Sequence, residues 1–313
     1  MRSSIIDEVR ELVRRFTPGQ SAKAESLRAM LAEYQRGWPP GHFYSPIPSL
    51  EQVRAHEATI WPSPPRQLAG IDLRERQQLE LLEELAKYYA EQPWSDQPGS
   101  GLRYGFDNPN FSYGESLLLY ALLRQLKPAR VIEIGSGHSS AATLDTNERF
   151  LDGAAKLTFI EPFPELLESL LTPADRLSVE IIASGVQDVP ASVFESLSAG
   201  DVLFIDSTHV AKVGSDVNYI MFDVLPRLAT GVYVHVHDIY YPFEYPKQWI
   251  YEGRAWNEAY LLRAFLQYND AYEIVLFGSF LGTFHRETLE TLMPLAARNP
   301  GSSLWMKKTT PSR

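Results

Sequence analysis

The 313-residue sequence contains no cysteine, which excludes disulfide bonds, thiolate metal sites and cysteine nucleophiles. It also lacks a long basic run: 39 acidic residues outnumber 29 basic ones, and the formal net charge is −10. Because nonspecific nucleic-acid binding depends on neutralising phosphates, we expect no nucleic-acid partner. No apolar run approaches the roughly 20 residues that cross a bilayer, and the N-terminus lacks the apolar core of a signal peptide. We therefore expect a cytoplasmic protein without a membrane partner.

The sequence does contain enough apolar material for a large core, because 44% of its residues are hydrophobic. Two segments rich in proline and aromatic residues, 37–48 and 61–65, interrupt the N-terminal part of the chain. Helical spacing of apolar residues around them predicts helices at 5–16, 21–34 and 73–90. We interpret residues 1–100 as an N-terminal helical accessory or lid region, residues 101–290 as the main domain, and residues 291–313 as a C-terminal tail.

From about residue 110 onward, short apolar runs alternate with helical patterns. Such alternation favours right-handed crossovers and a parallel sheet covered on both faces. We predict five parallel strands, at 130–134, 157–161, 178–182, 201–206 and 231–238. A β-hairpin should follow a helix at 255–267, with strands at 272–278 and 281–285. The sequence therefore predicts an α/β, Rossmann-like fold with a mostly parallel, seven-stranded sheet and a C-terminal β-hairpin.

A glycine turn follows the first predicted strand, in the sequence Glu133-Ile-Gly-Ser-Gly-His-Ser139. Glycines between a strand and a helix let the backbone approach a ligand closely. A pyrophosphate-binding turn would carry a third glycine where Ser140 stands, and Glu133 would repel phosphate. A carboxylate suits a cationic ligand such as the methionine moiety of S-adenosylmethionine, although a tight turn without any ligand is the alternative. The expected cofactor cradle consists of Glu133, Gly135, Ser136, Gly137 and Ser139.

Two further features place a nucleoside beside this turn. Glu161 ends the second predicted strand, where a carboxylate can accept hydrogen bonds from ribose hydroxyls, although exposed strand-end carboxylates are common. The loop Ser184-Gly-Val-Gln-Asp188 follows the third strand. Here the sequence resembles the class I S-adenosylmethionine-dependent methyltransferases over about residues 110–286, and catechol-type O-methyltransferases carry a similar loop. The resemblance implies that Val186 and Gln187 contact adenine and that Tyr113 covers the cofactor.

Acidic residues also end the fourth and fifth predicted strands, at Asp206 and Asp238. Folds of this kind bind ligands at that edge of the sheet, so Asp206 is expected to contact the cofactor as well. His209 stands where catechol-type enzymes have a catalytic lysine, and an imidazole with a pKa of about 6.5 suits a general base. We predict Asp206, His209 and Asp238 as catalytic residues, with His209 as the general base. The alternatives are a structural hydrogen bond for the histidine and solvated or helix-capping strand ends for the carboxylates.

The resemblance also raises the question of a metal. Catechol-type enzymes bind magnesium through two strand-end Asp residues and a following Asn, and Asp206 and Asp238 match the two Asp positions. Ile239 stands where the Asn is expected. Hard magnesium prefers oxygen ligands, whereas a softer divalent ion accepts imidazole. Whether a divalent metal is required is therefore left open.

Aromatic residues gather in two loops, 239–249 and 41–48, that we interpret as walls of a substrate site. Core packing of the same aromatic residues is an equal alternative. The residues expected to contact substrate are His209, His237, Tyr240 and Tyr44.

Together these features predict methyl transfer from S-adenosylmethionine to a hydroxyl of a small molecule, a sugar or a natural product. N-methylation, for which a base is less necessary, is one alternative. A nicotinamide-dependent oxidoreductase and a non-catalytic nucleotide-binding protein of the same fold are two others. Formation of a homo-oligomer is left open.

Overall fold

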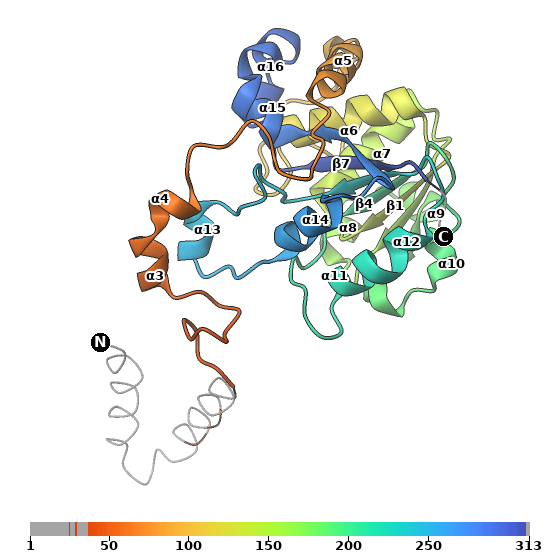
Figure 1. The fold of residues 1–313 in the computed structure, drawn as a ribbon. Helices are drawn as coiled ribbons and strands as arrows, with labels where there is room; N and C mark the ends of the chain where they lie inside the picture. Colours follow the sequence, from red (N-terminus) through yellow and green to blue (C-terminus); the bar gives the residue numbers. More distant parts are fainter. Residues whose placement is uncertain (1–24, 26–28, 30–36, 311–313) are drawn as a thin grey trace. The chain divides into compact units, whose positions relative to one another are not determined.

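The computed structural model describes residues 25, 29 and 37–310. The chain divides into two compact units, residues 1–62 and 63–313 (Figure 1). The helices expected at 5–16 and 21–34 lie outside the described residues, apart from the helical Glu25 and Ala29. Across the described residues, none of the helices has the length and apolar content that a membrane crossing requires.

The first unit contains two short helices, α3 (Leu50–Ala55) and α4 (Glu57–Ile60). Its boundary with the second unit lies between Pro62 and Ser63, earlier than the boundary expected near residue 100. The reason is that α5 (Glu75–Ala86) packs against α6 (Tyr113–Leu126) and the edge of the sheet. Residues 63–100 therefore belong to the larger unit.

The larger unit is built on a seven-stranded sheet with the strand order β3-β2-β1-β4-β5-β7-β6. The strands from β1 to β5 pair in parallel, whereas β7 runs antiparallel to both β5 and β6. Their bounds are β1 (Arg130–Ile134), β2 (Lys156–Ile160), β3 (Glu180–Ile182), β4 (Val202–Ile205), β5 (Tyr233–Val236), β6 (Tyr272–Phe277) and β7 (Leu304–Lys308). The predicted fold class, mostly parallel with an antiparallel C-terminal hairpin, is confirmed.

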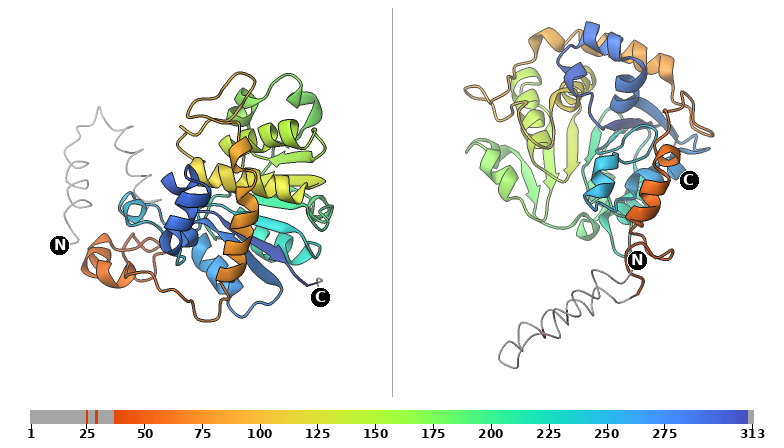
Figure 2. Two further views of the ribbon diagram at one scale, coloured as in Figure 1. Left: turned by 90° about the horizontal axis from the view of Figure 1, so that it is seen from above. Right: turned by 90° about the vertical axis from the view of Figure 1, so that its left-hand side faces the viewer.

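Helices cover both faces of this sheet, as the apolar central strands require, with α6 and α7 on one face and α11 and α12 on the other (Figures 1 and 2). All four residues of β4 are buried. The remaining helical elements are η2 (Tyr89–Glu91), α7 (His138–Phe150), α8 (Glu165–Leu170), α9 (Asp175–Ser178), η3 (Val186–Asp188), α10 (Ala191–Phe194), α11 (Asp216–Tyr219), η4 (Ile220–Val224), α12 (Leu225–Arg227), α13 (Lys247–Tyr251), α14 (Glu258–Leu266), α15 (Gly278–Phe284), α16 (Arg286–Leu292) and η5 (Ala296–Arg298).

The second strand of the C-terminal hairpin is not where we predicted it. Residues 281–285 belong to α15 and its C-cap, because Phe277, Phe280 and Phe284 recur at helical spacing rather than alternating. The strand that pairs with β6 is β7, whose residues Leu304 to Met306 are fully buried. The expectation of a tail over 291–313 is therefore wrong at 304–308, which form an inner strand of the sheet.

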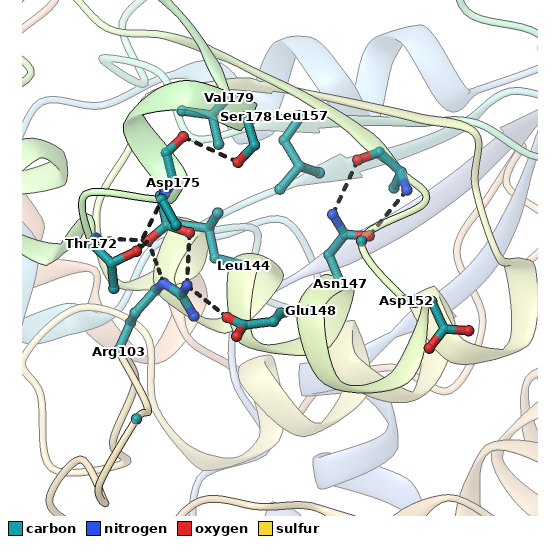
Figure 3. Close-up of a pocket in the computed structure, with 14 residues that line it drawn as sticks. Arg103, Leu144, Asn147, Glu148, Asp152, Leu157, Thr172, Asp175, Ser178 and Val179 are labelled. Atoms are coloured by element: carbon teal, nitrogen blue, oxygen red, sulfur yellow. Dashed lines mark hydrogen bonds and ion pairs between the residues drawn. The ribbon is translucent and has the colours of Figure 1, made fainter.

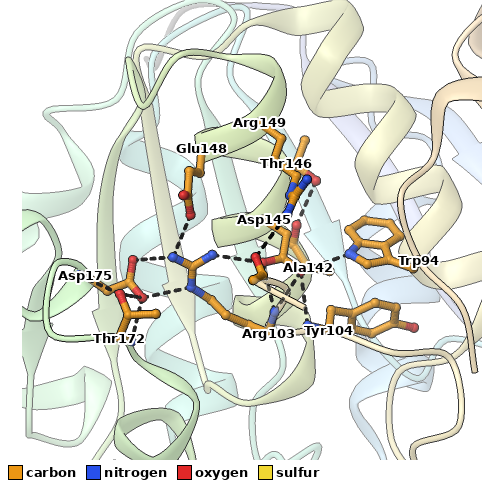
Figure 4. Close-up of polar contacts among 11 residues, drawn as sticks. Trp94, Arg103, Tyr104, Ala142, Asp145, Thr146, Glu148, Arg149, Thr172 and Asp175 are labelled. Atoms are coloured by element: carbon orange, nitrogen blue, oxygen red, sulfur yellow. Dashed lines mark hydrogen bonds and ion pairs between the residues drawn. The ribbon is translucent and has the colours of Figure 1, made fainter. Parts of the chain in front are cut away.

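A buried arginine ties the segment before α6 to the rest of the larger unit (Figure 4). The Arg103 side chain is only 7% exposed and donates to Asp175 through Nε and Nη2, at 2.8 and 2.7 Å. Its Nη1 donates to Asp145 of α7 at 2.9 Å, and Nη2 also donates to Glu148 at 2.7 Å. Asp145 additionally accepts from the indole of Trp94 at 2.9 Å. One guanidinium thus joins three segments that are distant in sequence.

The same arginine lines a cavity of about 600 Å³ between α7 and the start of α9 (Figure 3). In this view Arg103, Thr172 and Asp175 lie on one side of the cavity, and Asn147 and Asp152 lie on the other. Both carboxylate oxygens of Asp175 bind the arginine. The ion pairs therefore form part of the cavity wall.

Replacing this arginine should destabilise the fold. In Arg103→Met the carboxylates of Asp145 and Asp175 lose their charged partner while staying buried, so we expect a loss of about 3–5 kcal/mol in the free energy of unfolding. Arg149→Met is the matched control, because Arg149 is exposed and donates to one carbonyl, that of Gly101. It should cost less than about 1 kcal/mol. Urea unfolding followed by circular dichroism measures both, and equal losses would contradict the assignment.

Candidate functional site

The turn after β1 contacts the carboxyl ends of the neighbouring strands β2 and β4. Gly135 has a φ of +81°, and a Cβ placed on it would lie 2.0 Å from the carbonyl oxygen of Asp206 at the end of β4. The amide of Gly135 donates to Ile160 of β2 at 3.0 Å, and that of Asp206 donates to Ile134 at 2.8 Å. Only glycine combines a left-handed φ with so close an approach. This residue therefore sets the distance between the first loop and β4.

Glu133 is a fully buried carboxylate near the end of β1. Its Oε1 accepts from the hydroxyls of Ser139 and Ser140 at 2.5 and 3.0 Å, whereas Oε2 is buried without a hydrogen-bond partner. Burial raises the pKa of Glu133 to about 8, although the two serine hydroxyls oppose the rise. Ionising a buried carboxylate is costly, and a cation bound at the neighbouring turn would offset that cost. The residues present therefore fit a ligand that carries ammonium or sulfonium charge.

Glu161 holds the glycine turn against the end of β2. Its Oε2 accepts from the amide of Ser136 at 3.1 Å, and its Oε1 accepts from the amide of Phe163 at 2.9 Å. Each carboxylate oxygen retains a second lone pair, so the same group can also accept from ribose hydroxyls. Gly137 serves as the N-cap of α7, and its amide donates to the hydroxyl of Ser140 at 3.1 Å. The predicted cradle residues thus lie together around one turn.

The residues expected at the adenine and over the cofactor lie on separate elements. Val186 and Gln187 form the short helix η3, in which Val186 is buried and Gln187 is exposed. Tyr113 begins α6, where its hydroxyl donates to Asp96 at 2.9 Å and its ring stacks on Phe106. Tyr113 does not line the polar cavity described next. These three contacts with the cofactor stay predictions.

A polar cavity of about 370 Å³ opens at the carboxyl ends of β4 and β5. Four of the predicted residues line it, namely Asp206, His237, Asp238 and Tyr240, and His209 lies directly behind the carboxylates. The Nε2 atom of His209 is 3.4 Å from Asp206 Oδ1 and 3.7 Å from Asp238 Oδ2. Both His209 and Asp238 adopt left-handed φ values, +60° and +56°. Strained residues of this kind collect at functional sites.

His209 is held from both sides by carboxylates. Its Nδ1 lies 2.8 Å from Glu258 Oε2, and its carbonyl accepts from the amides of Asn257 and Glu258 at the start of α14. Burial alone would lower the pKa of His209, but hydrogen bonds to Asp206 and Glu258 raise it to about 10. The imidazole is therefore charged near neutral pH and carries no free nitrogen lone pair. A general base needs such a lone pair, so this charge does not favour the predicted role of His209 as the base, which stays a prediction. Nothing in the sequence indicated Glu258 as its partner.

His237 is a second charged imidazole in the same cavity. Its Nδ1 lies 3.7 Å from Glu115 Oε1, and its Nε2 lies 3.6 Å from Asp238 Oδ1. Burial opposes the charge, but the carboxylates of Asp206, Glu115 and Asp238 raise the pKa of His237 to about 9. In return, and against the effect of burial, the charges of His237 and His209 hold the pKa of Asp206 below its ordinary value. The cavity floor is thus a network of paired charges.

Several residues of this cavity were missed in the sequence. Glu115 belongs to the pattern Ser112-x-x-Glu115, which is typical of a helix N-terminus and indicates no ligand site. Ser302, whose hydroxyl oxygen lies 2.9 Å from Asp238 Oδ1 and 3.0 Å from Glu115 Oε1, arrives on the loop before β7. That strand was expected to be a tail, so no signal pointed to the residue. Also missed were Glu258, Arg254 and Trp256, whereas Trp249 belongs to the loop 239–249 that was expected to form a substrate wall.

Two further expectations stay predictions. Tyr44 lies in the first unit, where it is exposed and its ring is 5.2 Å from that of Trp38 and 4.3 Å from that of Phe43. A divalent metal at Asp206 and Asp238 is the second. Within residues 25, 29 and 37–310, no group of three or more His, Asp or Glu side chains is placed to hold a metal ion.

Comparison with known proteins identifies the family. Residues 132–239 match the family model of a methyltransferase domain, a span that begins in β1 and ends just beyond β5. The chain belongs to the class I S-adenosylmethionine-dependent methyltransferases. An uncharacterized protein of Archaeoglobus fulgidus is 35% identical to this methyltransferase over 165 residues, which are 51% of this chain and 73% of that protein.

Solved methyltransferases resemble the chain more distantly. A methyltransferase of Podospora anserina bound to S-adenosylhomocysteine is 13% identical, covers 83% of this chain and 95% of that one, and has a TM-score of 0.43. An O-methyltransferase of tomaymycin synthesis from Streptomyces achromogenes, in complex with S-adenosylmethionine, is 16% identical, covers 83% and 96%, and has a TM-score of 0.41. These values are too low to transfer a residue's role to this methyltransferase.

The first prediction from this site concerns the glycine turn. In Gly135→Ala the new methyl group meets a backbone carbonyl that cannot move independently, so we expect a loss of at least about 2 kcal/mol in stability and of S-adenosylhomocysteine binding. Gly153→Ala is the control, because Gly153 also has a positive φ (+68°) but has no atom within 4 Å of a new Cβ. It should cost about 1 kcal/mol and leave binding intact. Titration calorimetry and urea unfolding compare them; intact binding in Gly135→Ala would contradict the close approach.

The second prediction concerns the pH dependence of cofactor binding. Glu133 has a pKa of about 8 in the free protein, and a bound ammonium group favours its ionised form. Below pH 8 the carboxyl must therefore lose a proton when the ligand binds, so affinity should rise with pH and level off above about 8. Calorimetric titration with S-adenosylhomocysteine from pH 6.5 to 8.5 measures this rise.

Two variants identify which carboxyl group causes the pH dependence of binding. Glu133→Gln should weaken binding and remove the pH dependence, because it has no proton to lose. Glu161→Gln should weaken binding but retain the rise towards pH 8. An unchanged pH dependence in Glu133→Gln would show that another group titrates.

Proposed function

We propose that this methyltransferase methylates a hydroxyl oxygen of a small molecule bound in the 370 Å³ cavity. The observation that carries the proposal is the pair of carboxylates, Asp206 and Asp238, that end adjacent strands beside the glycine turn and face His209. When bound, S-adenosylmethionine supplies an electrophilic methyl group on a sulfonium. The chain must then hold the hydroxyl, accept its proton and keep water out.

We assign the two carboxylates to different sides of the reaction. The carbonyl of Asp206 touches the glycine turn at Gly135, so this residue belongs to the cofactor side. Asp238 lies one strand further out, in the cavity wall that also contains Tyr240 and Ser302. The substrate hydroxyl therefore donates to Asp238. In the reaction the Asp238 carboxylate would take up the hydroxyl proton as the oxygen–methyl bond formed and the methyl–sulfur bond broke, leaving S-adenosylhomocysteine.

In this assignment His209 is a positioning residue rather than the base. Its charged ring, anchored by Glu258, helps to hold the pKa of Asp206 below its ordinary value and lies 3.7 Å from Asp238 Oδ2. The charged ring of His237 lies 3.6 Å from the other oxygen of Asp238, Oδ1. Preorganised charges of this kind cost no reorganisation during the reaction.

The other walls favour a ring-bearing substrate. Tyr240, Trp249 and Trp256 line the cavity, with the rings of Tyr240 and Trp249 5.3 Å apart. Flat aromatic faces pack against the rings of sugars and of aromatic natural products. The accessory or lid role of the N-terminal region, the cytoplasmic location, the absence of a nucleic-acid partner and the metal stay predictions.

The test determines which atom is methylated and whether the reaction requires Asp238. The enzyme is incubated with carbon-13 methyl-labelled S-adenosylmethionine and a panel of amino sugars and aminophenols, which carry both hydroxyl and amine groups, and the product's carbon shift distinguishes O-methyl from N-methyl. We expect O-methylation, lowered about 10²- to 10⁴-fold in Asp238→Asn. The control Asp223→Asn alters an exposed carboxylate paired with Arg227 and should retain activity.

The pH profile separates Asp238 from His209 as the proton acceptor. With Asp238 as the acceptor, turnover at saturating S-adenosylmethionine should be flat between pH 7 and 8, below the pKa of about 9 at which His237 loses its charge. A base at His209 would make turnover rise about tenfold per pH unit towards its pKa of about 10. A rising profile, an N-methyl product or full activity in Asp238→Asn would contradict the proposal.

A further inference from the structure

We infer that the substrate carries a carboxylate and that Arg254 binds it at the aromatic side of the cavity. The inference rests on the proposed function, because it describes the far end of the same substrate. Arg254 is the one lysine or arginine among the residues that line this cavity in the described part of the chain.

The guanidinium of Arg254 lies beside two indole rings. Its Cζ lies 4.2 Å from the ring centroid of Trp249 and 5.1 Å from that of Trp256. The two indoles meet edge to face, with centroids 5.2 Å apart, and the amide of Arg254 donates to the Trp249 carbonyl at 3.0 Å. Cation–π contacts of this kind help to position a guanidinium and leave N–H groups for hydrogen bonds. Arg254 is therefore oriented without a strong acceptor.

The ion pair that Arg254 does make is weak. Its Nη2 lies 3.4 Å from Glu252 Oε2, and the two side chains are 38% and 42% exposed. Exposed pairs of this kind contribute little because water competes for both charges. The cavity's histidines differ, because carboxylates within 4 Å pair each of them. Arg254 is thus the lining cation that can still accept a counter-charge from a ligand.

Aromatic side chains link His209, which faces Asp238, to Arg254. The ring of Trp256 is 4.3 Å from that of His209, and Trp249 follows it at 5.2 Å. Because His209 lies 3.7 Å from Asp238 and Trp256 lies 5.1 Å from the guanidinium, these rings connect the neighbourhood of Asp238 to that of Arg254. A ring packed along it places a hydroxyl at Asp238 and a carboxylate, at its other end, at Arg254.

The charge of the cavity favours a carboxylate over a phosphate. An arginine fork matches either group. However, Asp206 and Asp238 also line this small space, and these carboxylates repel a dianion more strongly than a monoanion. A hydroxylated ring acid fits both the single arginine and the acidic floor.

The experiment compares two probes that differ in one charge. Wild-type protein is first saturated with S-adenosylhomocysteine and then titrated calorimetrically with 4-hydroxybenzoate and with 4-hydroxybenzamide. We expect the acid to bind about tenfold more tightly than the amide, or better. Arg254→Gln should remove this preference while leaving the amide's affinity unchanged, and Arg254→Lys should retain part of it.

A matched variant controls for the loss of charge alone. Arg286→Gln removes an arginine that is exposed on α16 and paired with Glu290, so the preference for the acid should persist. The inference is overturned if the wild type shows no preference, if the acid does not bind, or if Arg254→Gln keeps the preference. Tighter, Arg254-dependent binding of 4-hydroxyphenyl phosphate would overturn the assignment to a carboxylate.

The titration with S-adenosylhomocysteine distinguishes a failure of this inference from a failure of the proposed function. If S-adenosylhomocysteine itself does not bind, the proposed function fails and the inference fails with it. If S-adenosylhomocysteine binds but the acid has no advantage, the methyltransferase assignment stands and only the role of Arg254 is rejected.

Discussion

The site depends on one backbone contact, the approach of the turn after β1 to the end of β4. Gly135 lies so close to the carbonyl of Asp206 that a Cβ would leave 2.0 Å between them. β1 and β4 are also the neighbouring strands at which the strand order reverses direction, where α/β sheets leave a crevice for ligands. The contact therefore places the cofactor cradle and the two strand-end carboxylates side by side.

Paired charges then stabilise a cavity that would otherwise be costly to form. Asp206, Asp238 and Glu258 surround His209, and the left-handed conformations of His209 and Asp238 store strain at the same place. Two backbone hydrogen bonds join the His209 carbonyl to the start of α14, and they offset that strain. Away from the cavity, Arg103 performs a similar task for the segment before α6. Both networks join segments more than 40 residues apart.

The parts of the fold that the sequence predicted are those with a local signal. The first five strands are short apolar runs between helical patterns, and the glycine turn is a contiguous motif, so both were found. The C-terminal hairpin was expected, but its second strand was misplaced, because Leu304 to Met306 are too few residues for a periodic pattern and lie in an otherwise polar stretch. The segment 63–100 was assigned to an accessory region, because its packing against α6 and β6 is invisible in a linear pattern.

The sequence by itself determined the class of the protein and the kind of ligand. The glycines after β1, with Glu133 before them and Glu161 one βαβ unit later, predict a cationic nucleoside ligand from short motifs in the chain. Only the tertiary structure decided the chemistry beyond that ligand. Glu258 and Ser302 reach the cavity from elements 49 and 64 residues away from their partners His209 and Asp238. The charge on His209 depends on those distances in space, because electrostatic fields act between neighbours in the fold rather than neighbours in the chain.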